Sequence, residues 1–173
     1  MKKLFHSLIG FGLGLLSLAA CTEGSDYDID YTPIAPVGGQ YVVTVYSSHQ
    51  DSAYTEVTQT YAFLSNTSDY DTDKAWIRVG GYNAKNAYNI NAKVNIDMAT
   101  YTFEGTMVPD YIGNSAVPTD SVTLTGYATH NEYTTPSGTI TDFISFEWSR
   151  SDQPDYKYKA EGWKYTGWDG DDL

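Results

Sequence analysis

Hydrophobic and polar residues alternate along most of the chain after residue 38, and the period is two rather than the period of a helix. The alternation is clearest in residues 90–98, where Ala92, Val94 and Ile96 are separated by polar side chains. A strand with this pattern packs one face on a core and leaves the other in water. Turn residues separate eight such runs, which predict strands at 41–47, 55–64, 75–80, 90–98, 100–108, 121–129, 139–149 and 156–165.

Eight strands with short connections predict an all-β domain. The arrangement that this pattern favours is an eight-stranded antiparallel up-and-down barrel, because closure removes the exposed edges that promote aggregation. Closure requires the last strand, within residues 162–168, to pair with the first, within residues 41–46. A two-sheet β-sandwich with the same number of strands is the alternative.

The first twenty residues have the features of a secretory signal peptide. Lys2 and Lys3 give it a basic start, and an apolar stretch follows that is short for a spanning helix of about 20 residues. The sequence Leu18-Ala19-Ala20-Cys21 looks like the lipobox of bacterial lipoproteins, in which the thiol receives a diacylglycerol. We therefore predict lipidation of Cys21, with palmitate-type acyl chains holding the mature protein on a membrane. An ordinary signal peptide followed by a coincidental cysteine is the alternative.

Residues 21–37 predict an acidic, flexible tether, and residues 38–173 the globular barrel domain. Glu23, Asp26, Asp28 and Asp30 resemble the acidic export signals of some surface lipoproteins, although a solvated linker has the same composition. The predicted location is the cell envelope, anchored to the outer membrane. The periplasmic face of that membrane and the cell surface are the two alternative positions.

The composition excludes several classes of partner and site. Aromatic residues make up 15% of the chain and charged residues 18%, which indicates an ordered, β-rich domain. The net charge of −12 makes nucleic acid an unsuitable partner, because such binding depends on Lys and Arg. A single cysteine excludes an internal disulfide framework and a multi-cysteine zinc site.

The C-terminal region carries several short motifs. They are Thr135-Pro136-Ser137-Gly138, Ser151-Asp152-Gln153-Pro154 and Gly162-Trp163-Lys164-Tyr165-Thr166-Gly167-Trp168. These motifs resemble a family of small Bacteroidetes lipoproteins labelled lipid-binding putative hydrolases, although Tyr165 replaces a basic residue of the family's closing strand. Gly39-Gln40-Tyr41 also looks like the start of the family's first strand, so the resemblance extends over residues 38–172. It implies a lipocalin-like β-barrel that binds a lipid or another apolar molecule.

Catalytic and metal-binding patterns are weak. His49 and His130 are the histidines that follow the leader, and the chain has no Gly-x-Ser-x-Gly elbow, so hydrolase activity is not favoured but stays open. Residues 69–73 have the alternate acids of a calcium loop but lack its glycine and its closing glutamate. The acids at 169–172 lie at the chain end, where we expect fraying. No cofactor or metal is predicted.

Aromatic residues carry the remaining functional signal. We predict that rings on the strands line the barrel and bind the ligand, while packing in a filled core and outward stacking platforms for sugars are the alternatives. The candidate lining residues are Tyr61, Phe63, Trp76, Phe103, Tyr127, Trp148 and Trp163.

These observations leave three hypotheses. The favoured one is a lipid-anchored barrel that binds a lipid or another apolar small molecule. The second is a structural or interaction subunit of a surface uptake assembly for glycans or other nutrients. An esterase-like hydrolase is third. A closed cavity of about 300 Å³ or more favours the first, and a solid interior with an exposed aromatic patch favours the second.

The lipobox gives a direct test of the anchor. Cys21→Ala removes the acceptor thiol and leaves the barrel unchanged, so the variant should leave the membrane fraction and keep the circular dichroism spectrum of the wild type. Retention of the variant in membranes after a carbonate wash would show that the lipobox interpretation is wrong.

Overall fold

A computed structural model of the chain describes residues 31–82, 86–114 and 117–173. This part contains the eight predicted strands, joined by turns and by one short 3₁₀ helix at Ile112–Asn114. The strands are β1 (Gly39–His49), β2 (Thr55–Asn66), β3 (Lys74–Val79), β4 (Ile90–Asp97), β5 (Thr102–Pro109), β6 (Ser121–Thr134), β7 (Ile140–Arg150) and β8 (Gln153–Lys164).

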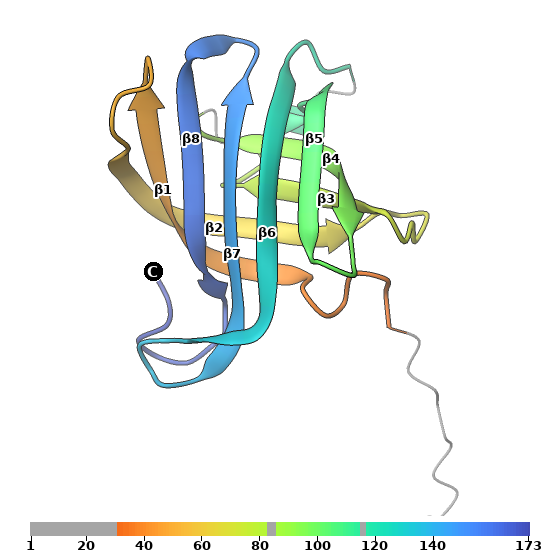
Figure 1. Ribbon diagram of the computed structural model, residues 1–173, viewed down its shortest axis with the longest axis vertical. Helices are drawn as coiled ribbons and strands as arrows, with labels where there is room; N and C mark the ends of the chain where they lie inside the picture. The colour runs from red at the N-terminus through yellow and green to blue at the C-terminus, as the bar shows by residue number, and fades with distance from the viewer. Residues whose placement is uncertain (1–30, 83–85, 115–116) are drawn as a thin grey trace, which may run out of the picture. The chain divides into compact units, whose positions relative to one another are not determined.

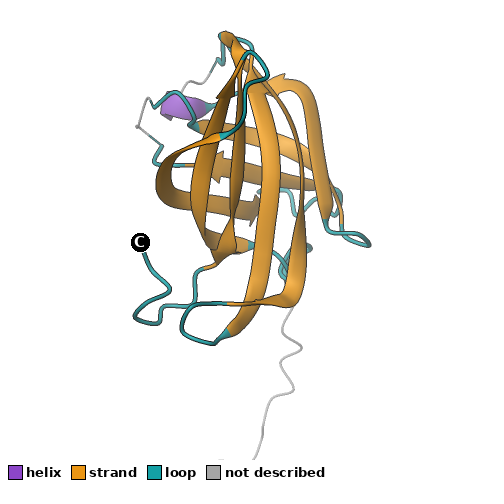
Figure 2. Ribbon diagram, turned by 60° about the vertical axis from the view of Figure 1, so that its left-hand side comes forward, coloured by secondary structure: helices purple, strands orange, loops and turns teal. Residues whose placement is uncertain are grey.

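The strands form one closed antiparallel barrel in sequence order (Figures 1 and 2). In Figure 1 strands β5 to β8 run vertically in front, and β2 to β4 cross behind them. Strand β8 pairs with β1 in a continuous register that includes Val43 opposite Gly162. This pairing confirms the predicted closure and excludes the two-sheet sandwich.

Gly162 allows β8 to approach β1 closely. A Cβ atom at this position would lie 1.8 Å from the carbonyl oxygen of Val42 and 2.7 Å from the Cα atom of Val43. These neighbours are backbone atoms that cannot rotate away. The seam between the first and last strands therefore requires a residue without a side chain.

The interior is a continuous hydrophobic core. Its side chains come from alternate positions of every strand, because successive residues of a strand point to opposite faces of the sheet. The fully buried members include Tyr41, Leu64, Ile77, Ile144 and Phe146.

The turn before β1 closes one end of this core. Ile34 and Val37 are fully buried, and the hydroxyl of Tyr41 donates to the carbonyl of Val37. The compact unit begins at Thr32, so the predicted boundary at residue 38 is corrected: the last part of the predicted tether belongs to the barrel.

The predicted signal peptide, Cys21 and the tether up to residue 30 lie outside the described residues. Within the described part of the chain, no helix has the length and apolar character needed to cross a membrane.

The seam gives a test of the closed barrel. Gly162→Ala should lower the free energy of unfolding by about 3 kcal/mol or more, because the new methyl group overlaps backbone. Gly105→Ala is the matched control: the nearest atoms to its new methyl group belong to the Val108 side chain, at 3.0 Å and 3.1 Å, rather than to backbone. We expect the control to stay within about 1 kcal/mol of the wild type. Equal stability of the two variants in urea unfolding would contradict the tight seam.

Candidate functional site

Two of the seven candidate aromatic residues point into the barrel. Phe103 and Trp148 are 1% and 2% exposed and belong to the core. Phe146 connects them, with ring centroids 5.9 Å from Phe103 and 5.2 Å from Trp148. Tyr158 extends this interior row, 5.5 Å from Trp148.

The other five candidates lie on the outer face of the sheet, so the prediction that they line the interior is wrong. Their strand neighbours, most of them small, occupy the inner positions: Ala62 lies between Tyr61 and Phe63, and Ala75 precedes Trp76. An eight-stranded barrel has only enough interior for a limited volume of side chains. The interior holds the rings of Phe103 and Trp148, and the other five candidate rings lie outside. The five residues are Tyr61, Phe63, Trp76, Tyr127 and Trp163.

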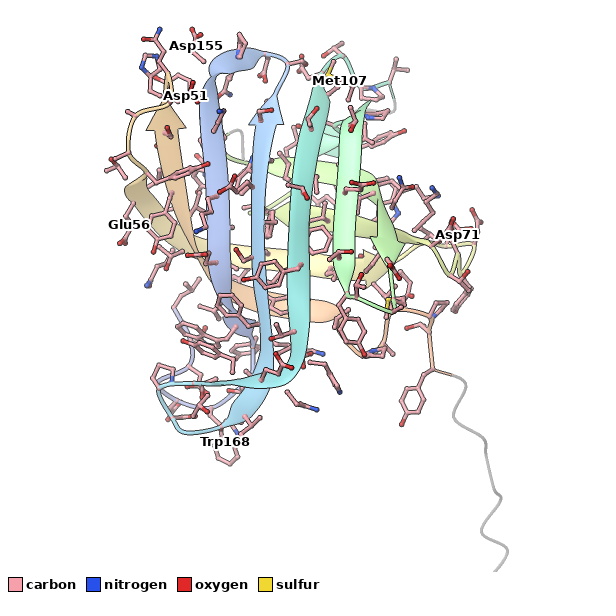
Figure 3. The ribbon with its side chains drawn as sticks, in the orientation of Figure 1. Asp51, Glu56, Asp71, Met107, Asp155 and Trp168 are labelled. Carbon is pink, nitrogen blue, oxygen red and sulfur yellow. The ribbon has the colours of Figure 1, made fainter. Side chains whose placement is uncertain are left out.

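Outer contacts confirm this placement. The Tyr133 ring stacks on Trp163 at a centroid distance of 5.6 Å, and the Trp76 ring meets Tyr111 edge-on at 5.4 Å. Tyr127 is 46% exposed. Trp168, after the last strand, is 65% exposed and projects from one end of the molecule (Figure 3).

Side chains fill the barrel interior. A hollow large enough for a ligand would expose the side chains around it, yet the core residues are between 0% and 4% exposed. Any ligand site in the described structure must therefore lie on the outer face or at an end of the barrel.

A groove of about 440 Å³ lies beside the turn that closes the barrel. The turn contributes Ala35, the end of β2 contributes Phe63 and Asn66, and β3 contributes Arg78. The main-chain N–H of Ile34 donates to the side-chain oxygen of Asn66 at 3.2 Å and holds the turn against β2. We call this hollow the Arg78 groove. Its volume lies within the range of small-molecule sites.

The guanidinium group of Arg78 is held between two aromatic rings. Its central carbon lies 3.9 Å from the ring centroid of Phe63 and 3.9 Å from that of Tyr82. Nη1 donates to the carbonyl of Gly80 at 3.3 Å. Among the described residues, no carboxylate lies within ion-pair distance of Arg78. A cation without an acidic partner is notable in a chain with a net charge of −12.

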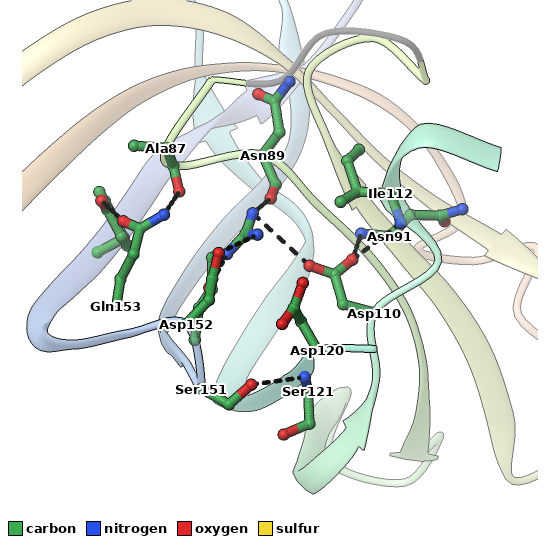
Figure 4. Close-up of polar contacts among 12 residues, drawn as sticks. Ala87, Asn89, Asn91, Asp110, Ile112, Asp120, Ser121, Ser151, Asp152 and Gln153 are labelled. Atoms are coloured by element: carbon green, nitrogen blue, oxygen red, sulfur yellow. Dashed lines mark hydrogen bonds and ion pairs between the residues drawn. The ribbon is translucent and has the colours of Figure 1, made fainter. Parts of the chain in front are cut away.

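Arg150, the other arginine of the chain, is fully paired. It is the last residue of β7, and 8% of its side chain is exposed. Its partners Asn89, Asp110 and Asp152 are labelled in Figure 4. Nε and Nη2 donate to the two oxygens of Asp152, each at 2.9 Å, and Nη1 donates to the carbonyl of Asn89. A carboxylate oxygen of Asp110 lies 3.7 Å from Nη1 of Arg150, and burial raises the pKa of this carboxyl group. Because acids and a carbonyl occupy this guanidinium, the cluster stabilises the loops and offers no free charge to a ligand.

His130 makes half of a hydrolase triad. Nδ1 lies 3.0 Å from a carboxylate oxygen of Asp142, which is buried and also bonds Lys164 at 2.8 Å. Nε2, the nitrogen that would take a proton from a nucleophile, instead lies 3.0 Å from the side-chain amide of Asn131. Asn131 reaches it because an irregularity in the β6–β7 pairing puts this residue at a φ of 57°. The geometry thus places an amide where a triad needs a hydroxyl.

His49 does not complete a triad either. Its ring packs against Tyr156 at 4.7 Å, and the Ser52 hydroxyl accepts from the main-chain N–H of His49 rather than contacting the ring.

Asp71, in the acidic segment 69–73, contacts neighbouring polar side chains. Asp71, labelled in Figure 3, accepts from Thr67 at 3.0 Å and pairs with Lys93 at 3.4 Å. No group of three or more metal-binding side chains occurs among the described residues.

The chain end is not frayed at Asp171, contrary to expectation. This residue is fully buried, and its carboxylate accepts from Ser137 Oγ and Thr166 Oγ1, both at 2.7 Å, and from the main-chain N–H of Ser137 at 2.9 Å. Its carbonyl accepts from the Trp163 indole at 3.1 Å. These contacts fasten the end of the chain to the β6–β7 hairpin.

Sequence reasoning missed Arg78, Arg150 and Asp171. For Arg78 a signal was available, because it shares one face of a predicted strand with Trp76. The bonds of Asp171 to Ser137 span 34 residues, and no local pattern indicates such a contact.

A closed eight-stranded up-and-down β-barrel with an apolar interior defines a protein of the lipocalin-like class. The sequence model of the family described as lipid-binding putative hydrolase matches residues 26–169. The chain belongs to this family, and the family description supports lipid binding. No curated protein matches the sequence.

The buried Asp171 gives a pH-dependent test. Burial by itself raises its pKa, but the bonds from Ser137 and Thr166 outweigh this and lower the pKa from 3.8 to about 2. A carboxyl whose pKa is lower in the folded state stabilises the fold above its unfolded pKa. That stability is lost as the pH falls, between about pH 4 and pH 2.

Asp171→Asn should therefore unfold in less urea than the wild type at pH 7, and the difference should shrink as the pH falls towards 2. Asp169→Asn is the control, because Asp169 is an exposed acid of the same segment. A gap between Asp171→Asn and the wild type that does not change with pH would contradict the role of this carboxylate.

Proposed function

We propose that this protein is a lipid-anchored lipoprotein of the cell envelope that binds a lipid or another apolar small molecule in the Arg78 groove. The lipobox at Cys21 supports the anchor, and the acids that follow it suit an outer-membrane location. The family description supports the class of ligand.

The groove is the observation that carries the proposal. Its volume of about 440 Å³ suits a small molecule, and Ala35 and Phe63 give part of its wall an apolar character. Asn66 and Arg78 add polar groups at the side. This combination of an apolar wall and a few polar groups is typical of sites that bind amphipathic molecules.

A hydrolase has less support. The imidazole of His130 is hydrogen-bonded to Asp142 and Asn131. The Ser52 hydroxyl accepts a hydrogen bond from the main-chain N–H of His49 rather than from its imidazole. Neither arrangement presents an activated nucleophile to the Arg78 groove.

An interaction subunit of a surface uptake assembly is the second candidate. The filled interior and the exposed rings of Tyr127 and Trp168 favour it, because exposed aromatic residues are common at protein interfaces. The two functions are compatible, since these rings are not among the residues that line the Arg78 groove.

Filling the groove tests the proposal. Ala35→Trp places a large ring in the groove without replacing a core residue. It should weaken the binding of dodecan-1-ol, measured by isothermal titration calorimetry, by about tenfold or more. Ala53→Trp is the control: it adds the same ring at an exposed loop position.

If the wild type, Ala35→Trp and Ala53→Trp bind dodecan-1-ol equally, the groove is not the site. If the wild type does not bind it, and native mass spectrometry of the protein from its own cells finds no associated lipid, the interaction subunit becomes the better interpretation.

A further inference from the structure

Arg78 has the geometry of a ligand-recognising group rather than a structural one. Of the two arginines, Arg150 satisfies its charge with Asp152 and Asp110, whereas Arg78 donates to the carbonyl of Gly80 and has no carboxylate partner among the described residues. A structural arginine on the surface of an acidic protein would readily find a carboxylate. Arg78 instead contacts two aromatic rings.

The rings determine how a ligand can approach. Phe63 and Tyr82 each have a ring centroid 3.9 Å from the central carbon of the guanidinium. The N–H groups of a guanidinium point outward in its own plane. One of these groups is used by Gly80. A planar, edge-on donor matches the two oxygens of a carboxylate or phosphate, which accept from arginine in a bidentate manner. Packing against two rings also fixes the side chain in advance, which lowers the entropy lost on binding.

The surroundings of Arg78 favour an anion with an apolar body. The main part of the groove has Ala35 and Phe63 in its wall. Beyond Arg78, a second hollow of about 300 Å³ shares Asn66, Arg78 and Tyr82 with the first and adds Trp76 and Asn91. Arg78 thus stands where an apolar groove meets a hollow with two asparagine side chains.

We propose that Arg78 selects an anionic amphiphile: its guanidinium edge binds a carboxylate or phosphate group, and the apolar chain lies along Ala35 and Phe63. This inference rests on the proposed function, because it assumes that the groove binds a lipid-like molecule. It specifies which lipids the site prefers and how they are oriented.

Matched ligands test two claims separately: that the groove binds an alkyl chain, and that Arg78 selects a charged head group. Dodecanoate and dodecyl phosphate carry a charge, dodecan-1-ol has the same alkyl chain without it, and acetate and inorganic phosphate have the charge without the chain. Each is titrated by calorimetry into the wild-type protein, Arg78→Gln, Arg78→Lys and Lys74→Gln. Lys74→Gln is the control for net charge, because Lys74 also lies on β3 and contacts Asn95 rather than an acid.

We expect the wild type and Lys74→Gln to bind the two charged amphiphiles roughly ten- to a hundredfold more tightly than dodecan-1-ol. Arg78→Gln should lose this preference, so that it binds the charged amphiphiles no more tightly than it binds dodecan-1-ol. Arg78→Lys should keep only part of the preference, because lysine lacks the planar fork. If Arg78→Gln is unfolded by circular dichroism, Arg78→Lys provides the comparison.

Three results would overturn the inference or its basis, and they can be told apart. If dodecan-1-ol binds the wild type as tightly as dodecanoate, lipid binding stands and the role of Arg78 is wrong. The same holds if Arg78→Gln retains the preference for charge. If acetate or inorganic phosphate binds as tightly as the amphiphiles in an Arg78-dependent manner, the anion site stands and the proposed lipid function is wrong.

Discussion

The pairing of β1 with β8 is the constraint on which the rest of the structure depends. It converts a meander of eight strands into a closed ring, and it is possible because Gly162 lets the two backbones approach closely. Once the ring is closed, every strand residue must point either into the core or out of the barrel. The filled interior and the aromatic outer surface both follow from this division. So does the position of Arg78, which lies on the outer face because Ile77 and Val79 beside it point inward.

The strands and their closure could be predicted from the sequence, whereas the face of each aromatic ring could not. Alternation marks residues 90–98 clearly because one face is polar. In β2, by contrast, Tyr61-Ala62-Phe63-Leu64 is apolar on both faces, so the period of two gives no direction. The size of the side chains decides which of them point inward. Ala62, Ala75 and other small residues lie inside because the interior of an eight-stranded barrel has a limited volume. The Arg78 groove depends on contacts between β2, β3 and the residues that follow β3, and these contacts exist only in the folded chain.

Because the barrel interior is filled and five of the candidate rings point outward, a lipid would bind on the surface of the barrel rather than in its centre. A barrel with a hollow centre would enclose its ligand, but here the core residues occupy the centre. On our proposal the ligand lies against the outside of β2 and β3, next to the turn that follows the tether. A chain anchored through Cys21 would therefore carry the groove on the part of the barrel that directly follows its membrane anchor in sequence. The acidic character of the protein makes Arg78 stand out, because this cation has no carboxylate partner among the described residues.

The most direct test of this account is the position of a bound lipid. Nuclear Overhauser contacts between the alkyl protons of dodecanoate and an isotope-labelled protein would locate the chain. The account predicts contacts with the Ala35 methyl group and the Phe63 ring, which line the groove. Contacts with Phe103 and Phe146 in the barrel interior would contradict it, because they would require the core to open around the ligand.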